Sequence, residues 1–118
     1  MFQFLRGVAV IAAMMLNCGA AFADPDTQSA NFYLSACRDF TVQSKISSDS
    51  FTRGLCVGNI DALMTVGAPL GICPPPTATL KQAILVVVQY IDQRPARMHE
   101  VFAALAMEAL EAAWPCKN

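Results

Sequence analysis

Four cysteines, Cys37, Cys56, Cys73 and Cys116, constrain this chain more than any other residues do. The chain has 118 residues, which indicates a single domain. The sequence has a fifth cysteine, Cys18, within the expected signal peptide, so the mature chain keeps an even number. An even number of cysteines in a small exported domain favours disulfides. The spacing contains no close cysteine pair, and His99 has no second histidine, so no zinc site is predicted. We therefore expect a disulfide-stapled scaffold with no metal and no cofactor.

The N-terminus has the pattern of a secretory signal peptide over residues 1–23. Arg6 supplies the positive charge, and an apolar run follows from Gly7 to Leu16. That run is shorter than the about 20 residues that a membrane span needs, which disfavours a retained anchor. Ala21 and Ala23 form the small-residue cleavage pattern. We therefore expect residues 24–118 to form the mature domain, in the periplasm, with no stable membrane span after processing.

Cys18 raises the alternative of a lipoprotein, but Leu16 and Asn17 stand where a lipobox needs small residues. Cleavage after Ala23 removes one basic residue of eight, so the formal charge falls from −1 to −2. No basic patch and no polybasic segment remains in the mature chain. Neither nucleic acid nor a charged membrane surface is therefore an expected partner.

The fold class that the sequence predicts is all-α, a small bundle of about four helices stapled by two disulfides. Apolar residues recur at helical spacing in four segments, with turn-forming residues between them. The run Ile84 to Val88 alone would also suit a buried strand, but the helical pattern continues over three turns. The expected helices are Asp26–Phe40, Phe51–Thr65, Leu80–Arg94 and Ala96–Trp114.

Each expected helix has an apolar face and local start signals. Ser29, Ser50 and either Thr77 or Thr79 are the predicted N-caps. Gly54 and Gly58 lie inside the second helix, where each costs about 1 kcal/mol relative to alanine, and we expect them to admit a neighbouring backbone. The residues expected to face the core are Phe32, Tyr33, Ala36, Cys37 and Phe40; Cys56, Ile60, Leu63 and Met64; Leu80, Ile84, Val87, Val88 and Ile91; and Met98, Val101, Phe102, Leu105 and Ala109.

Helix lengths select one of the three disulfide connectivities that four cysteines allow. Cys37 lies about one turn before the end of the first helix, and Cys56 about one turn after the start of the second. The third and fourth helices form a hairpin with its turn at Arg94-Pro95, so Cys73 and Cys116 meet at its open end. We predict Cys37–Cys56 and Cys73–Cys116, worth roughly 3 and 4 kcal/mol by the chain-entropy model.

The chain offers little that could catalyse a reaction. His99 is the only histidine, the cysteines are used as disulfides, and the carboxylates are scattered. We therefore do not expect an enzyme and instead expect a binding protein.

The loops Val42–Ser50 and Val66–Pro76 are the expected binding elements, because loops on a rigid scaffold commonly carry function. The candidate contact residues are Leu70 and Ile72 at the tip of the second loop, with Lys45 and Asp49 in the first. The alternative for Leu70 and Ile72 is that they simply close the helical core.

The mature chain resembles the Rap/Tai family of periplasmic immunity proteins over about residues 30–116. Asn59 departs from the family pattern, which commonly has an aromatic residue at that position. The residues that carry the resemblance follow in chain order: Ala30-Asn31, Leu34 and Cys37; the run Gly54 to Ile60, in which Asn59 is the departure; Cys73-Pro74, Gln82 and Val86; Tyr90-Ile91 and Pro95; and Ala109-Leu110 with Trp114-Pro115-Cys116.

The resemblance implies a helical protein, often a homodimer, that protects its own cell against effectors of type VI secretion. Its partner would be a periplasmic cell-wall hydrolase of the amidase type, which it inhibits by inserting a loop or helix end into the active-site cleft. The competing hypothesis is a small periplasmic stress protein, chaperone-like and without a toxin partner. Few clustered carboxylates are present to drive acid-induced opening, which weighs against it.

Overall fold

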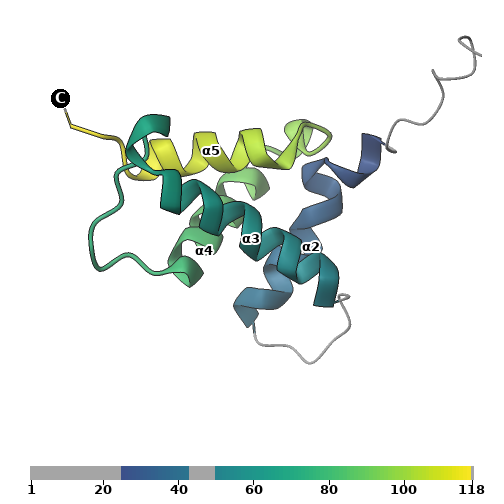
Figure 1. The fold of residues 1–118 in the computed structure, drawn as a ribbon. Helices are drawn as coiled ribbons and strands as arrows, with labels where there is room; N and C mark the ends of the chain where they lie inside the picture. Colours follow the sequence, from purple (N-terminus) through teal and green to yellow (C-terminus); the bar gives the residue numbers. More distant parts are fainter. Residues whose placement is uncertain (1–24, 43–49, 118) are drawn as a thin grey trace, which may run out of the picture.

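The computed structural model describes residues 25–42 and 50–117. The predicted signal peptide, Cys18, Lys45 and Asp49 lie outside the described residues. The described part contains four α-helices and no strand (Figure 1), which confirms the predicted all-α class. The α-helices are α2 (Ala30–Val42), α3 (Ser50–Val66), α4 (Leu80–Asp92) and α5 (Phe102–Ala113), and the short 3-10 helices are η2 (Pro25–Thr27), η3 (Ala68–Leu70) and η4 (Pro95–Arg97).

Helix α2 begins at Ala30, after the predicted N-cap. The Ser29 hydroxyl accepts a hydrogen bond from the Phe32 N–H at 3.4 Å, as an N-cap does. The expected apolar face is partly wrong, because Phe32 is 36% exposed and Leu34, which was left out, is buried. The helix turns its Ala30, Leu34 and Cys37 side inward, since these residues follow the i, i+4, i+7 spacing of one face.

Helices α3 and α4 lie close to their predicted bounds. Cys56 and Ile60 of α3 are fully buried, with Leu63 and Met64 packed against the core as expected. Thr79 is the N-cap of α4, because its hydroxyl accepts a hydrogen bond from the Gln82 N–H at 3.1 Å. The prediction that Ile84 to Val88 belongs to a helix is therefore confirmed.

The fourth predicted helix is wrong over residues 96–101. The chain instead forms η4, a turn and an isolated β-bridge between Ser29 and Val101 before α5 begins. As a result Val101, expected in the core, is 50% exposed.

The first turn of α2 explains this break. Helix N-termini have backbone N–H groups without intrahelical acceptors. The Ala30 N–H donates to the Glu100 carbonyl and the Asn31 N–H to the Met98 carbonyl, each at 2.9 Å. In a continuous helix these two carbonyls would be occupied by residues one turn later. A long-range backbone contact therefore replaces the first predicted turns of the last helix.

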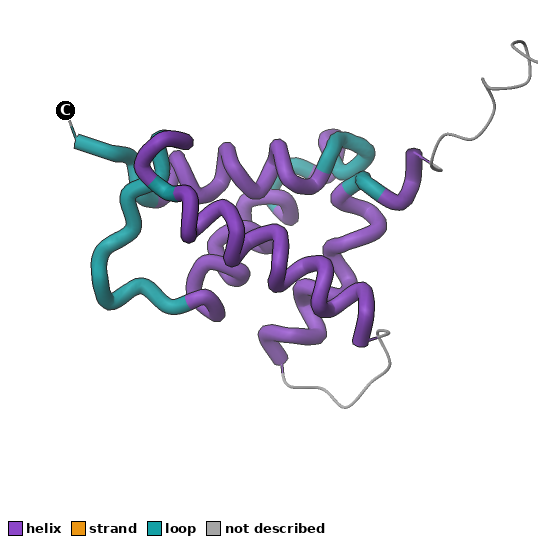
Figure 2. Tube along the Cα trace, in the orientation of Figure 1, coloured by secondary structure: helices purple, strands orange, loops and turns teal. Residues whose placement is uncertain are grey.

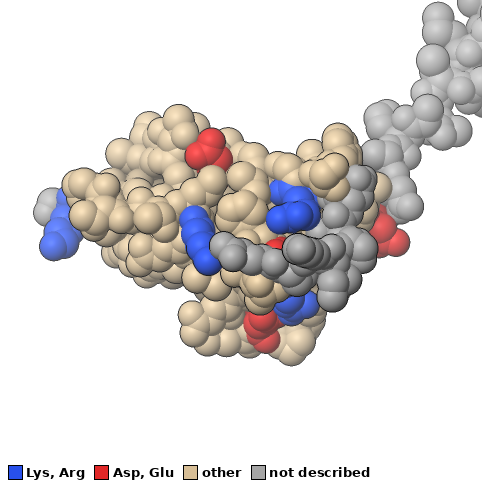
Figure 3. All heavy atoms as spheres, turned by 90° about the horizontal axis from the view of Figure 1, so that it is seen from below, with Lys and Arg blue, Asp and Glu red and all other residues tan. Residues whose placement is uncertain are grey.

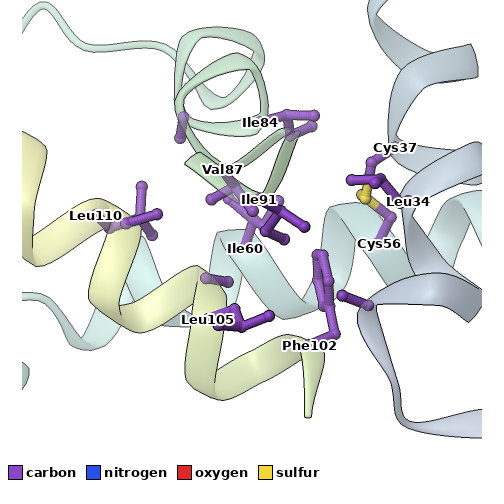
Figure 4. Close-up of a cluster of buried hydrophobic side chains, with 14 of the residues drawn as sticks. Leu34, Cys37, Cys56, Ile60, Ile84, Val87, Ile91, Phe102, Leu105 and Leu110 are labelled. Atoms are coloured by element: carbon purple, nitrogen blue, oxygen red, sulfur yellow. A yellow bond between two sulfur atoms is a disulfide. The ribbon is translucent and has the colours of Figure 1, made fainter. Parts of the chain in front are cut away.

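One hydrophobic core joins the four helices (Figure 4). Its largest fully buried side chain is Phe102, whose ring stacks on Tyr33 with centroids 4.7 Å apart. Leu110 was left out of the predicted core yet is fully buried. Further fully buried side chains are Leu34, Ile60, Ile72, Ile84, Val87, Ile91 and Leu105.

Both predicted disulfides are present. Cys37–Cys56 joins α2 to α3 with a Cα–Cα distance of 5.6 Å, and both residues are fully buried (Figure 4). Cys73–Cys116 joins the loop before α4 to the segment after α5, with a Cα–Cα distance of 4.9 Å. The first disulfide is thus part of the core, whereas the second ties two non-helical segments together.

In the view of Figure 1, α3 crosses the front of the molecule and α4 lies behind it. Helix α5 runs along the top, and α2 lies on the right, at the end away from the C-terminus. Contacts link α2 to α3 and α4, and α4 to α5. Among the described helices, none combines the length and the apolar character that crossing a membrane requires.

Candidate partner-binding surface

Of the four predicted contact residues, Leu70 and Ile72 lie within the described part of the chain. Ile72 is fully buried in the core, and Leu70 packs against the core. Both residues therefore close the helical core, which was the alternative to a contact role. Ile72 is 0% exposed, so it could contact a partner only by leaving the core. The exposed positions near the tip of this loop are Ala68 and Pro69.

Two glycines in the left-handed region shape this loop. Gly67 has φ 58° and Gly71 has φ 75°, a range that other residues rarely adopt. The Gly67 N–H caps α3 by donating to the Leu63 carbonyl at 2.9 Å, and the Gly71 N–H donates to the Ala68 carbonyl at 2.9 Å. The chain therefore reverses within a few residues and holds Ala68 and Pro69 outward on η3.

The segment that follows is fixed to the end of α5. Ile72 forms an isolated antiparallel bridge with Pro115, and the Cys73 N–H donates to the Trp114 carbonyl at 2.8 Å. The disulfide Cys73–Cys116 lies directly beside these contacts. The loop is consequently held by a buried side chain, backbone pairing and a covalent bond, and its shape is set before any partner arrives.

The loop between α3 and α4 has four exposed small or proline residues. We call the surface that they form the proline end and define it by Ala68, Pro69, Pro75 and Pro76, all of which are exposed. The Ala78 N–H donates to the Pro75 carbonyl at 2.9 Å, which makes a turn in the long loop before α4 (Figure 2). The side chains of the proline end carry neither charge nor hydrogen-bond donor, so it suits an apolar, shape-matched contact.

The charged residues concentrate elsewhere, beside η4. Arg97 donates to both oxygens of Glu100 and to both oxygens of Glu108, at 2.8–2.9 Å. The Tyr90 hydroxyl also donates to Glu108 at 3.0 Å, and the guanidinium of Arg94 lies 3.6 Å from the centroid of the Tyr90 ring. These hydrogen bonds hold the pKa of both glutamates below the usual range and raise the pKa of Arg97.

This network fixes η4 between α4 and α5, and another ion pair joins Arg38 of α2 to Asp92 of α4. Every carboxylate named here is engaged with an arginine, an arrangement that orders the surface. Viewed from below, the visible charged side chains are few, some red and blue groups lie next to one another, and most of the described surface is uncharged (Figure 3).

The groups that could carry chemistry are dispersed. In the described ranges, no three His, Cys, Asp or Glu side chains gather where they could hold a metal ion. The four cysteines of these ranges are all in disulfides, and His99 is exposed. A hollow of about 340 Å³ between α4 and α5 is lined by Gln89, Gln93 and Ala112 and by Tyr90, whose hydroxyl donates to Glu108.

In the loop that the sequence predicts as a binding element, Leu70 and Ile72 lie inward and Ala68 and Pro69 lie outward. The apolar size of Leu70 and Ile72 made them the evident anchors, and the same property draws them inward. The signal for the outward residues is the pattern Gly67-Ala68-Pro69, because a proline between turn glycines marks an exposed tight turn.

The comparisons with known proteins provide one match. A family model described as Rap1a immunity proteins matches residues 28–116, which include all four α-helices and both disulfides. No match was found among curated proteins or among solved structures.

Proposed function

We propose that this chain, which belongs to the Rap1a immunity protein family, binds and inhibits a peptidoglycan amidase delivered by type VI secretion, and so protects its own cell. The observation that carries the proposal is the family match over nearly the whole helical domain. The role proposed is that of a non-catalytic inhibitor, which acts by occupying the cleft of the toxin.

The proline end is the part of the surface that we assign to the toxin. A loop fixed in advance loses less conformational freedom on binding, which favours affinity. Gly67, Gly71 and the Cys73–Cys116 disulfide provide that fixation, while Ala68 and Pro69 are presented outward. Lys45 and Asp49 remain proposed secondary contacts in the first loop.

The compartment in the proposal is the periplasm, reached through the signal peptide expected over residues 1–23. Disulfides persist in oxidising compartments and are rare in the cytosol, which supports this location. Cell-wall amidases act on peptidoglycan in the same compartment. We also propose that the protein forms a homodimer, as many members of the resembled family do.

The direct test is inhibition of an amidase encoded beside this gene. Purified residues 24–118 should form a stable complex with that enzyme and stop its release of peptides from isolated peptidoglycan. Expression of the protein in the periplasm should rescue cells that carry the toxin there. A neighbouring hydrolase that is neither bound nor inhibited would remove the amidase assignment.

A matched pair of variants locates the contact. Ala68→Arg places a long charged side chain on the proline end, whereas Ala104→Arg makes the same change at an exposed site on α5. We expect the first to weaken inhibition at least tenfold and the second to leave it unchanged, with both proteins equally folded by circular dichroism. The opposite pattern would move the contact from the proline end to α5.

A further inference from the structure

The two disulfides differ in their access to solvent. Cys37 and Cys56 are both 0% exposed and join α2 to α3 inside the core (Figure 4). Cys73 is exposed and Cys116 is half-buried, and neither residue belongs to a helix. A reagent in solution can therefore reach Cys73–Cys116 in the folded protein, whereas it reaches Cys37–Cys56 only when α2 and α3 separate.

The surroundings of Cys73 leave it open to an incoming thiol. Pro74 follows Cys73 directly, and the residue before a proline is biased toward an extended conformation. The loop before α4 and the chain after α5 lie together at one end of the molecule (Figure 1). A thiolate can thus approach the disulfide without displacing a helix.

The first half of the loop, residues 67–72, is held without help from this disulfide. The Leu70 and Ile72 N–H groups donate to the Gly67 carbonyl at 2.9 and 3.2 Å. The Ile72 side chain is also fully buried in the core. These contacts keep the Ala68 and Pro69 part of the proline end in place whether Cys73–Cys116 is closed or open.

The second half, residues 73–78, depends on Cys73 for its attachment to the segment after α5. The Cys73 N–H donates to the Trp114 carbonyl at 2.8 Å, beside the disulfide. Within the described ranges, the other backbone hydrogen bond of this half runs from the Ala78 N–H to the Pro75 carbonyl and is internal to it. Opening the disulfide leaves a single hydrogen bond at Cys73, which water can replace.

We propose that Cys73–Cys116 is a site of thiol–disulfide exchange with the dithiol of an oxidoreductase. Its opening frees the Pro75 and Pro76 part of the proline end while the helical fold and Cys37–Cys56 are kept. Exposed disulfides are the labile and regulatory ones among those of exported proteins, and buried ones are structural.

The exchange takes two displacements. A thiolate of the dithiol attacks Sγ of Cys73, the S–S bond breaks, and Cys116 leaves as a thiolate that takes up a proton. The second thiolate of the dithiol then attacks its own partner sulfur in the mixed disulfide, and Cys73 leaves and is protonated in turn. Two electrons and two protons pass to the protein, which gains two thiols, and the dithiol becomes a disulfide.

The consequence for inhibition rests on the proposed function. Pro75 and Pro76 belong to the surface assigned to the toxin, and a loop that is no longer fixed loses more conformational freedom on binding. Reduction at this site should therefore weaken the complex with the amidase. Ile72 stays in the core and keeps Cys73 near Cys116, so reoxidation should restore the complex.

Selective reduction is the first test. Folded residues 24–118 are treated with dithiothreitol at neutral pH, quenched with N-ethylmaleimide at intervals and analysed by mass spectrometry. Cys73 and Cys116 should be labelled together, at least tenfold faster than Cys37 and Cys56, with the helical circular dichroism retained. Equal rates for the two pairs, or loss of the helical signal with the first pair, would overturn the proposal.

Low urea provides the control for local opening. Urea acts in proportion to the surface that an opening exposes. It should accelerate the labelling of Cys37 and Cys56 and leave that of Cys73 and Cys116 nearly unchanged. Equal acceleration of both pairs would mean that Cys73–Cys116 also opens through unfolding, which contradicts the proposal.

Hydrogen exchange followed by NMR is the second test, on the protein reduced at Cys73–Cys116 alone. The amides of Cys73 and Ala78 should exchange at least tenfold faster than in the oxidised protein, and those of Leu70 and Ile72 should change little. Unchanged exchange at Cys73, or equal acceleration at Ile72, would contradict the division of the loop into two halves.

Amidase inhibition is the third test, with the oxidised and the selectively reduced protein compared. Reduction should weaken inhibition at least tenfold, and equal inhibition by both forms would overturn the role in inhibition. The first two tests contain no amidase. Selective labelling together with an amidase that neither form inhibits would therefore place the error in the proposed function and support the exchange site.

Discussion

Replacement of Gly58 by alanine tests the structure most directly, because the result depends on open space beside a helix. Gly58 lies in the interior of α3, and the added methyl group would meet nothing within 4 Å. Alanine is favoured over glycine in a helix by about 1 kcal/mol, partly because it restricts the unfolded chain. We expect Gly58→Ala to increase the free energy of unfolding of the monomer by this amount and to raise Tm by about 4–8 °C.

The same substitution at Gly71 is the matched control, with the opposite sign. Gly71 has φ 75°, and the left-handed conformation costs other residues about 1–2 kcal/mol. A Cβ atom at this position would also lie 3.2 Å from Oε1 of Glu111, which would have to shift. Gly71→Ala should therefore lower Tm while Gly58→Ala raises it, although both changes add one methyl group.

The measurement is thermal unfolding of oxidised residues 24–118 followed by circular dichroism, at a concentration where sedimentation shows a monomer. Dilution is needed because association into the proposed homodimer would add to the stability of the monomer. The two variants should differ by about 2–3 kcal/mol in the free energy of unfolding. A Cβ atom at Gly54 or Gly58 would meet no heavy atom within 4 Å, so the expectation that a neighbouring backbone of the same chain comes close is wrong. If Gly58→Ala lowers the Tm of the monomer, another part of the chain covers α3 at Gly58 and the space beside this residue is not open.

Three further predictions concern the rest of the scaffold. Replacing both Cys73 and Cys116 by serine opens a loop with a sequence separation of 43, so the free energy of unfolding measured in urea should fall by about 4 kcal/mol. An unchanged urea midpoint would mean that the backbone pairing holds the two segments together without the disulfide. Ile60→Ala should cost about 2–5 kcal/mol in the same assay, whereas Ile60→Val should cost about 0.5–1.5 kcal/mol, because the side chain is fully buried. The pKa of both Glu100 and Glu108 is lower in the folded protein than its ordinary value of 4.5, so the stabilisation is present above that pH and is lost as the pH falls through the folded values. Tm should therefore drop more steeply on acidification in the wild type than in a Glu100→Gln/Glu108→Gln variant, and equal slopes would contradict this role.

The disulfide pairing could be predicted from sequence because it depends on local geometry. Helix bounds follow from breakers and caps, and the bounds of neighbouring helices set which cysteines lie at the same level. The pairing of Cys37 with Cys56 and of Cys73 with Cys116 needed no knowledge of how the two helix pairs pack together. The same local signals placed α3 and α4 within a residue or two of their ends.

The core face of α2 could not be predicted as reliably, because apolar residues occur on more than one side of that helix. Phe32 and Leu34 both suit a core by composition, and only the position of the neighbouring helices leaves Phe32 partly exposed and Leu34 buried. Amphipathic periodicity fixes a helix but not its rotation when the apolar stripe is wide.

The sequence alone determined the helical class, the four-cysteine scaffold and the family resemblance, since these depend on residue types and on spacing along the chain. Tertiary structure alone decided the break before α5, where the Met98 and Glu100 carbonyls accept hydrogen bonds from the start of α2. It also decided that Ile72 lies inside and that the space beside Gly58 is open. In each case the outcome depends on residues distant in sequence, which compete for the same hydrogen bond or the same volume.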